Sequence, residues 1–149
     1  MKAENFFEKE FKTFGLKSQR KYPNEELCRF LGRNKKLFKK NTKCLEVGVG
    51  GGGNLMPLID MNFRIDAIDI SKTAINLLKK KYKKINFKKM DMLDINNLNK
   101  RYDLIIDVFS SYALNTTSGK KFLSNVHKIL NKNGIFFSYF PSKKSDTWK

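Results

Sequence analysis

Apolar residues along the chain fall into two kinds of pattern. Short runs rich in apolar residues, typical of buried strands, lie at residues 44–47, 65–70, 85–90, 102–108 and 135–140. Apolar residues spaced every three or four positions predict helices at 4–16, from 22, from 54, from 72 and at about 117–131. Because strands and helices alternate over short connections, the pattern favours a parallel sheet with both faces covered.

Right-handed connections between parallel strands give such a chain a Rossmann-like, doubly wound α/β fold. We therefore expect a mostly parallel sheet of about five strands with helices on both faces. In these sheets, ligands bind beyond the carboxyl ends of the strands. We expect residues 1–40 to form a helical lead-in and residues 41–149 to form the domain that contains the sheet.

The connection between the first predicted strand and the next helix is rich in glycine. The segment 43–54 reads KCLEVGVGGGGN. Without a Cβ atom, glycine adopts positive φ and lets the backbone come close to a ligand, and the following helix start offers unpaired N–H groups. A strand that runs through glycines into a helix is therefore typical of a nucleotide-binding loop.

An acidic residue lies at or just after the end of each of the first four predicted strands. The four acids are Glu46, Asp69, Asp91 and Asp107. A single acid at a strand end often caps a helix or faces water. Four at the same edge of one sheet favour a shared binding site.

These residues resemble the motifs of class I S-adenosylmethionine (SAM)-dependent methyltransferases, and the resemblance covers residues 45–140. The first motif of that family is an acid, one residue and Gly-x-Gly-x-Gly, which Glu46, Gly48, Gly50 and Gly52 match. Later segments that resemble family motifs are AIDIS (67–71), KKMDML (88–93), YDLIIDVFSSYAL (102–114) and HKILNKNGIFFSYF (127–140). In the last segment, Asn-Gly replaces the usual Pro-Gly turn.

For the first motif, the resemblance implies that Gly48, Gly50 and Gly52 let the backbone approach the amino-acid and sugar parts of SAM. Glu46 would orient the loop or meet the ammonium group of the cofactor through water. Asn54 matches a polar residue common at the start of the following helix.

The resemblance gives the later residues roles along the rest of the cofactor. Asp69 would accept both ribose hydroxyls, and Ile70 would pack on the adenine. Asp91 would accept the adenine amino group, with the Met92 backbone beside it, and Asp107 would lie near the methyl group. SAM is therefore the expected cofactor, and the expected reaction is methyl transfer to a small-molecule or glycan-type acceptor.

The sequence assigns no catalytic residue. Methyl transfer depends largely on positioning, and a general base is needed only for a protonated acceptor. Asp107 and Tyr112 are candidate bases, whereas His127 lies within a predicted helix and is expected to be structural. Tyr22, in the lead-in, is a candidate contact near the methionine end of the cofactor.

Two other functions fit part of the pattern. Gly48, Gly50 and Gly53 satisfy Gly-x-Gly-x-x-Gly, with Asp69 21 residues after the first glycine, as in NAD(P)- or FAD-binding oxidoreductases. The acids at the other strand ends favour SAM over a dinucleotide. The second alternative, a SAM-binding module without catalysis, stays open because the family fold continues past its fifth strand, whereas this chain ends at Lys149.

The net charge of +17 favours RNA as an alternative acceptor. The lysines are scattered, however, and Asn, Ile and Phe are enriched with them, so a compositional bias is the preferred explanation of the charge. The run after the fourth strand, DVFS, lacks the proline-rich motif of amino-group DNA methylases.

We expect a cytoplasmic protein with no membrane segment, because no apolar run approaches the roughly 20 residues that cross a bilayer. Cys28 and Cys44 have no CxxC spacing and are expected to be reduced thiols. A domain that ends after a Phe-rich fifth strand would leave that edge unpaired, so we also expect an oligomer that covers it. The residues form no pattern of metal ligands.

Overall fold

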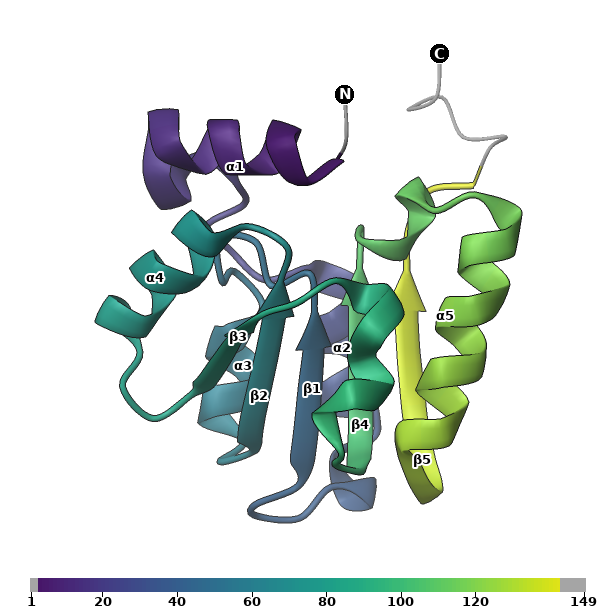
Figure 1. The fold of residues 1–149 in the computed structure, drawn as a ribbon. Helices are drawn as coiled ribbons and strands as arrows, with labels where there is room; N and C mark the ends of the chain where they lie inside the picture. Colours follow the sequence, from purple (N-terminus) through teal and green to yellow (C-terminus); the bar gives the residue numbers. More distant parts are fainter. Residues whose placement is uncertain (1–2, 143–149) are drawn as a thin grey trace.

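The computed structural model describes residues 3–142 and contains one sheet of five parallel strands (Figure 1). The strands are β1 (Lys43–Val47), β2 (Arg64–Asp69), β3 (Asn86–Lys89), β4 (Tyr102–Val108) and β5 (Leu130–Tyr139). Their order across the sheet is β3-β2-β1-β4-β5, so the chain winds outward from β1 in one direction and then in the other. The predicted doubly wound α/β fold is confirmed.

Five α-helices accompany the sheet, and three of them begin at a polar side chain that caps the first turn. They are α1 (Ala3–Phe14), α2 (Glu25–Arg33), α3 (Leu55–Asp60), α4 (Lys72–Lys81) and α5 (Thr116–Ile129). The short 3₁₀ helices are η1 (Gly15–Ser18), η2 (Lys35–Leu37), η3 (Met92–Leu98) and η4 (Ser111–Ala113). The side chains of Asn24, Ser71 and Asn115 accept a hydrogen bond from the first turn of α2, α4 and α5. Within residues 3–142, no helix is long and apolar enough to span a bilayer.

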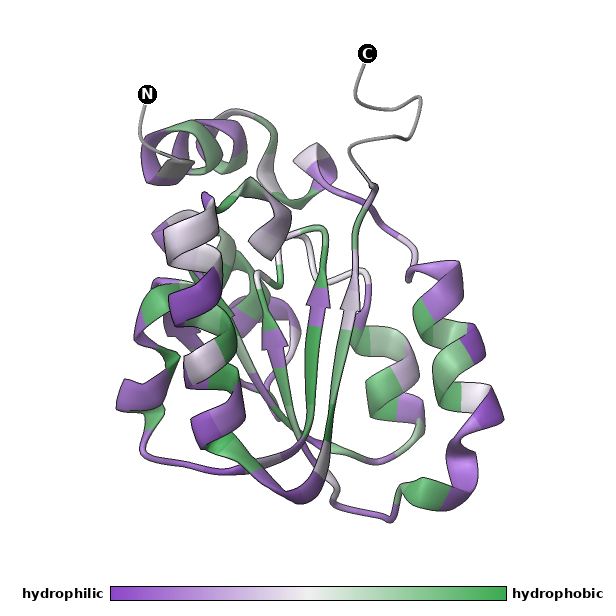
Figure 2. Ribbon diagram, turned by 90° about the vertical axis from the view of Figure 1, so that its right-hand side faces the viewer, coloured by the Kyte–Doolittle hydropathy of each residue, from purple (hydrophilic) through white to green (hydrophobic). Residues whose placement is uncertain are grey.

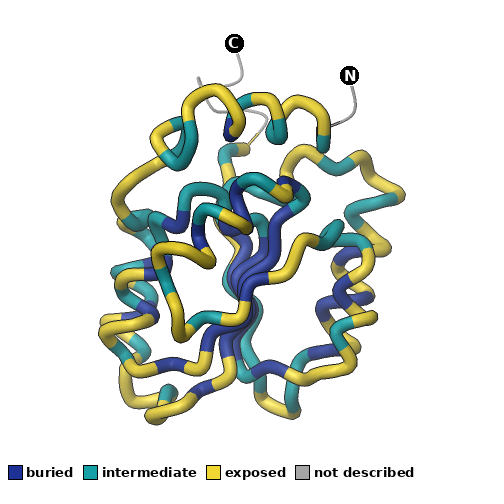
Figure 3. The backbone as a smooth tube through the Cα atoms, turned by 60° about the vertical axis from the view of Figure 1, so that its left-hand side comes forward, coloured by how far each residue is buried: buried dark blue, intermediate teal, exposed yellow. Residues whose placement is uncertain are grey.

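The two faces of the sheet carry separate apolar clusters. On one face, α2, α3 and α4 bury leucines such as Leu27, Leu58 and Leu78. On the other face, η3 and α5 bury Ile95 and Phe122. The strands are mostly hydrophobic along their length (Figure 2) and form the most deeply buried part of the molecule (Figure 3). Coverage on both faces is the arrangement that the apolar runs predict.

The junction between α5 and β5 differs from the expected one. The sequence predicts a helix to about residue 131, an Asn133-Gly134 turn and a strand from 135, whereas β5 already begins at Leu130. Leu130 pairs with Tyr102 and Ile135 with Leu104, so the intervening residues form an irregularity in the strand. Asn133, at the centre of it, has a φ of 64°. The Asn-Gly turn is therefore accommodated as a bulge within the edge strand.

The N-terminal helix α1 lies apart from both faces, beyond the carboxyl end of β2 and against α4 (Figure 1). Glu8 fixes it there, because its carboxylate accepts hydrogen bonds from Ser71 Oγ at 2.7 Å and from Thr73 Oγ1 at 2.6 Å. In the first turn of α1, Glu4 pairs with Lys89 at 2.7 Å. The lead-in therefore closes over the edge of the sheet where ligands are expected.

Candidate functional site

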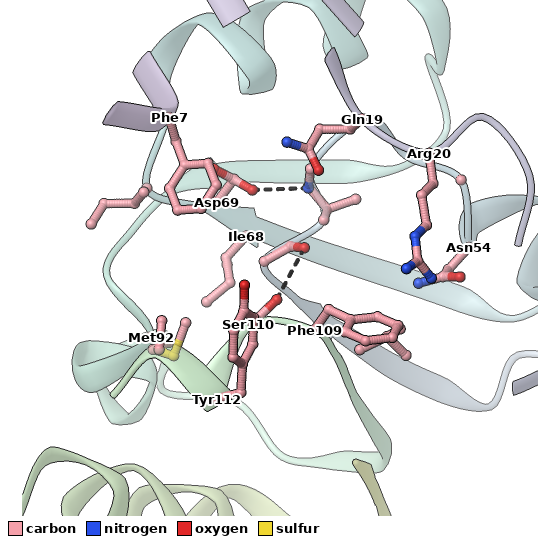
Figure 4. Close-up of a pocket in the computed structure, with 18 of the residues that line it drawn as sticks. Phe7, Gln19, Arg20, Asn54, Ile68, Asp69, Met92, Phe109, Ser110 and Tyr112 are labelled. Carbon is pink, nitrogen blue, oxygen red and sulfur yellow. Dashed lines mark hydrogen bonds between the residues drawn. The ribbon is translucent and has the colours of Figure 1, made fainter. Parts of the chain in front are cut away.

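A pocket of about 470 Å³ opens at the carboxyl edge of the sheet (Figure 4). Its wall combines the glycine-rich loop after β1, the ends of β2, β3 and β4, helix α1 and the segment 19–24. The volume lies within the range of about 300–1,000 Å³ typical of small-molecule sites. The pocket occurs where the doubly wound fold predicts ligand binding.

Three glycines of the loop adopt the left-handed backbone conformation. Gly48, Gly50 and Gly52 have φ values of 68°, 53° and 78°. A Cβ on Gly48 would lie 2.0 Å from Ser110 Oγ, which donates a hydrogen bond to the Val47 carbonyl. Both the backbone and the close approach of the loop after β4 therefore require glycine at position 48.

The other two glycines of the loop accommodate the lead-in. A Cβ on Gly51 would lie 3.0 Å from the Leu16 carbonyl oxygen. A Cβ on Gly53 would lie 2.7 Å from the carbonyl oxygen of Arg20 and 2.9 Å from that of Tyr22. The segment before α2 therefore packs directly on the loop, backbone against backbone.

Asp69 fixes the same loop from the end of β2. One carboxylate oxygen accepts a hydrogen bond from the Gly50 N–H at 2.9 Å, and the other accepts one from the Ser71 N–H at 2.8 Å. Burial raises the pKa of Asp69, although these backbone hydrogen bonds act to lower it. Asp69 lines the pocket together with its neighbour Ile70.

Asp91 and Met92 form the next part of the wall. The Asp91 carboxylate accepts a hydrogen bond from the Leu93 N–H at 2.9 Å and caps the start of η3. This cap explains why η3 begins directly after Asp91. Met92 and Leu93 follow along the pocket, so one acid lies between apolar side chains.

Behind the glycine loop lies a pair of polar side chains, Glu46 and Asn54. Asn54 donates a hydrogen bond to Glu46 Oε1 at 3.2 Å and accepts one from the Asn24 N–H at 2.9 Å. Glu46 is only 2% exposed, and its Oε2 has no hydrogen-bond partner among the described residues. Burial, reinforced by the charge of Asp69, raises the pKa of Glu46 to about 8.

Asp107 is fully buried at the end of β4 and holds the loop that follows. Its carboxylate accepts hydrogen bonds from the N–H groups of Ser110 and Ser111 and from the hydroxyls of Ser111 and Ser138. Phe109, inside this loop, has a φ of 56° and donates its N–H to the Tyr139 carbonyl at 2.9 Å. A bulky residue in this conformation is a rare outlier that the surrounding contacts must impose.

The structure thus brings most of the predicted site residues around one pocket. The ones that line it are Gly48, Gly50, Asn54, Asp69, Ile70, Asp91 and Met92. Glu46, Gly52 and Asp107 lie behind the wall and support it. Of the further candidates, Tyr22 and Tyr112 line the pocket, whereas His127 is exposed on α5 and lies outside it.

Several lining residues carry no sequence signal of their own. Phe7 and Phe11 belong to the apolar side of α1 and line the pocket. Their spacing in the sequence predicts a helix, but it does not predict that the helix covers the pocket. Arg20 lies in the segment before α2, with its guanidinium 4.2 Å from the centre of the Phe109 ring. The positive φ of Phe109 has no counterpart in the sequence pattern.

Comparison with known proteins agrees with this geometry. Residues 44–134 match the methyltransferase domain family, whereas no curated protein matches significantly. The structure of PKMT2 from Rickettsia typhi is similar with 28% identity and a TM-score of 0.59, over 66% of this chain and 21% of that one.

Two further solved structures show the same fold at lower identity. One is the glycopeptide N-methyltransferase MtfA complexed with sinefungin, with 19% identity and a TM-score of 0.65 over 74% of this chain and 50% of that one. The other is magnesium protoporphyrin IX methyltransferase from Synechocystis with bound SAM, with 15% identity and a TM-score of 0.67 over 88% of this chain and 73% of that one.

The chain spans from 21% to 57% of the length of the first four solved structures it resembles. The family match covers more than half of this chain, and the strand order and glycine loop agree with it. The chain therefore belongs to the methyltransferase domain family and has the fold of class I SAM-dependent methyltransferases.

Proposed function

We propose that this domain binds SAM and transfers its methyl group to a small-molecule or glycan-type acceptor. The observation that carries the proposal is that the glycine loop, Asp69 and Asp91 meet around one pocket. SAM combines a ribose with two hydroxyls, an adenine and a zwitterionic amino-acid end. The wall of the pocket offers a chemically suitable contact for each of these parts of SAM.

In this proposal Asp69 accepts the ribose hydroxyls with the lone pairs that its backbone hydrogen bonds leave. Asp91 accepts the adenine amino group, and the adenine packs between Ile70 and Met92. The amino-acid end extends along Gly48 and Gly50 toward Asn54. Bound there, SAM would supply an electrophilic methyl group for attack by the acceptor.

In this proposal, Glu46, Gly52 and Asp107, which lie behind the pocket wall, act by positioning the residues that line it. Glu46 orients the loop through Asn54 and is available to the ammonium group through water. Gly52 packs against the α4 side, where a Cβ would lie 2.8 Å from Leu78 Cδ2. Asp107 shapes the loop that carries Phe109 beside the methyl end. The catalytic contribution of the domain is then mainly to position SAM and the acceptor.

The acceptor is proposed from the size and character of the pocket. Beyond the glycine loop, the wall consists of Val108, Phe109, Ser110, Tyr112 and Leu114, which suits a small, partly apolar acceptor. The glycopeptide and magnesium protoporphyrin IX enzymes named above have acceptors of this general kind, which supports the choice. Tyr112 remains the candidate base for an acceptor that must lose a proton.

Calorimetric titration with SAM and S-adenosylhomocysteine tests the proposal. We expect micromolar affinity for both ligands, and a loss of about 10- to 100-fold in Asp69→Asn, because hydrogen bonds to a charged group contribute about 1.5–3 kcal/mol. Asp60→Asn, an exposed acid at the end of α3, is the matched control and is expected to bind normally. Circular dichroism verifies that each variant is folded. A folded wild type that binds neither ligand contradicts the proposal.

The net charge of +17 keeps an RNA acceptor as the second candidate. RNA binding through many phosphate contacts would weaken steeply with salt. Filter binding of a structured RNA at about 50 and 200 mM salt therefore separates the two. If the protein binds RNA only weakly, and no more tightly than it binds other polyanions at either salt concentration, the result favours the small-molecule acceptor.

The division into a lead-in, residues 1–40, and a methyltransferase domain, residues 41–149, belongs to the same proposal. The pocket is lined from both parts, so we propose that they act as one unit. Cys28 and Cys44 are free thiols, which supports a reducing compartment such as the cytoplasm. Among residues 3–142, β5 pairs on one side only, with β4, and we propose that a further chain or segment covers its other edge.

A further inference from the structure

All five strands begin at one edge of the sheet, opposite the pocket, because the sheet is parallel (Figure 1). The segments that enter the strands meet there and form the amino edge, residues 34–43, 61–64, 82–86, 99–101 and 128–134. Each of these segments carries exposed Lys or Arg, and none carries Asp or Glu. The segment that enters β1 contributes Lys35, Lys36, Lys39, Lys40 and Lys43. The amino edge is therefore strongly cationic.

The opposite edge of the sheet carries a different charge. The segments that leave β1, β2, β3 and β4 contain no Lys or Arg, and they are residues 48–54, 70–71, 90–91 and 109–115. Helix α1, which lies at that edge, mixes glutamates with its lysines. A compositional bias toward lysine enriches both edges alike. It does not by itself explain why the cations lie in the segments that enter the strands.

Few carboxylates neutralise the amino edge. Asp66 pairs with Lys100 at 2.7 Å. The Asp103 carboxylate accepts a hydrogen bond from the Lys43 N–H at 2.9 Å. Asp60, at the end of α3, is exposed nearby and forms no ion pair in the described part of the chain. Most cations of the edge therefore face solvent without an acidic partner among the described residues.

A hollow of about 290 Å³ lies at this edge, between the end of η3 and the end of α5. The residues that line it are Asn96, Asn99, Lys100, Arg101, Lys128 and Ile129. The Arg101 guanidinium is held in place, because it donates a hydrogen bond to the Leu130 carbonyl at 3.0 Å. Cationic and amide donors around one depression suit an anion with several oxygen atoms, such as a phosphate group.

The cations also form a row along the edge. Neighbouring strands lie about 4.8 Å apart, so the starts of five strands span about 20 Å. In the order of the strands across the sheet, the row runs through Lys84, Arg64, Lys43, Arg101 and Lys132. At about 3.4 Å per nucleotide, the row is as long as about six nucleotides of one strand. A linear polyanion can therefore contact several cations at once.

The other side chains of the amino edge narrow the choice of partner. Its aromatic residues, Phe38, Phe63 and Tyr82, are not exposed, so bases have no surface on which to stack. Leu37 is the one large apolar side chain of these segments that is exposed. The edge therefore lacks the apolar face that inserts into a lipid surface. Charge without stacking or insertion fits a phosphodiester backbone.

We propose that the amino edge docks the backbone of a nucleic acid, independently of its sequence, and that the hollow beside Arg101 and Lys128 holds one of its phosphates. At about 3.3 Å per residue, the seven residues of β4 separate this edge from the pocket by about 20 Å. The nucleic acid is therefore a docking partner and not the methyl acceptor. The inference goes beyond the proposed function and does not depend on it.

Fluorescence anisotropy with a labelled single-stranded RNA of about 12 nucleotides, twice the length of the row, measures the binding. The titrations are made at several salt concentrations between about 50 and 200 mM. The hollow variant is Arg101→Gln/Lys128→Gln. It leaves the ion pair between Lys100 and Asp66 in place.

A second edge variant, Lys83→Gln/Lys84→Gln, removes cations at the far end of the row, from the segment that enters β3. These exposed lysines form no ion pair in the described part of the chain, so the variant is expected to fold normally. The matched control is Lys120→Gln/Lys121→Gln, which removes two exposed lysines near the start of α5. All three variants have the same net charge.

We expect each edge variant to lose about tenfold in affinity for the RNA at about 50 mM salt, as two phosphate contacts disappear. The slope of log K against log salt should fall in magnitude by about 1.4, at about 0.7 for each phosphate contact. The control should keep the wild-type slope. Both edge variants should bind S-adenosylhomocysteine as wild type does, because the pocket lies at the other edge.

Equal losses in the control and the edge variants would overturn the inference, because the RNA would then respond only to net charge. A loss in the control alone, or in no variant, would overturn it as well. So would a wild type that leaves the RNA unbound at about 50 mM salt. Poly-glutamate that competes as well as RNA would assign the edge to an acidic protein instead, and preferential binding of vesicles rich in anionic phospholipid would assign it to a membrane surface.

Discussion

At the scale of single residues, Glu46 has the most unusual environment in the site. Its carboxyl group is buried beneath the glycine loop, and Asn54 supplies its one hydrogen bond among the described residues. Burial and the nearby Asp69 raise its pKa to about 8, so the folded domain without ligand holds this acid protonated at neutral pH. A cation bound nearby would favour the ionised form.

The raised pKa predicts how stability varies with pH. The folded state keeps a proton on Glu46 between the ordinary value of 4.5 and about 8, whereas the unfolded state releases it. The contribution of Glu46 to stability is therefore complete below pH 4.5 and is lost as the pH rises to 8. Between pH 5.5 and 8.5 we expect wild type to lose about 3 kcal/mol relative to Glu46→Gln.

Urea unfolding of both proteins at pH 5.5, 7.0 and 8.5 measures this difference. Comparison with Glu46→Gln cancels the titration of the groups that do not interact with Glu46. Stability curves that run parallel over this range would show that Glu46 is already ionised in the folded domain.

At the scale of elements, the attachment of α1 decides whether the pocket is closed. Glu8 is the main polar anchor. Its carboxylate accepts hydrogen bonds from Ser71 and Thr73 at the start of α4. Partial burial acts to raise the pKa of Glu8, but these hydrogen bonds outweigh it and lower the pKa to about 2. Phe7 and Phe11 on the same helix complete the pocket wall.

We expect Glu8→Gln to loosen α1 without unfolding the sheet, because it removes the charge that Ser71 and Thr73 stabilise. Hydrogen exchange should accelerate in α1 and stay unchanged in α5, and affinity for S-adenosylhomocysteine should fall by about tenfold with the loss of about 1.4 kcal/mol of contacts. Glu10→Gln, on the same helix outside these contacts, is the control.

Acid should produce the same loosening in wild type. Because the folded pKa of Glu8 is lowered, its contribution is complete above pH 4.5 and is lost as the pH falls toward 2. Exchange in α1 that is insensitive to both the substitution and acid would mean that its apolar side alone holds the helix.

Comparison of β4, β5 and α1 with their predicted boundaries shows which features of an element a local sequence pattern can predict. β4 follows the predicted boundaries because its apolar run is continuous and the chain buries it on both faces. β5 begins earlier than expected because Leu130 pairs with Tyr102, a contact between segments far apart in the sequence that no local pattern contains. The amphipathic pattern of α1 predicts a helix, but whether it covers the sheet or the site depends on the partner of Glu8.

At the scale of the whole molecule, the motifs of the sequence place the nucleoside half of the site better than the rest. The acids at strand ends converge because parallel strands all end at one edge. Arg20 and Phe109 were beyond sequence reasoning, since one depends on how the lead-in packs on Gly53 and the other on a backbone conformation imposed by Asp107. The family match over residues 44–134 likewise leaves the lead-in outside.

The most direct test of the central claim is a crystal structure of the domain grown with S-adenosylhomocysteine. We expect the ribose hydroxyls on Asp69, the adenine beside Asp91 and Met92, and the amino-acid end beyond Gly50 toward Arg20. Clear density for the ligand in this pocket, in that orientation, would establish the cofactor site. Density for the ligand elsewhere on the molecule, or with the nucleoside at the Arg20 end, would contradict the account.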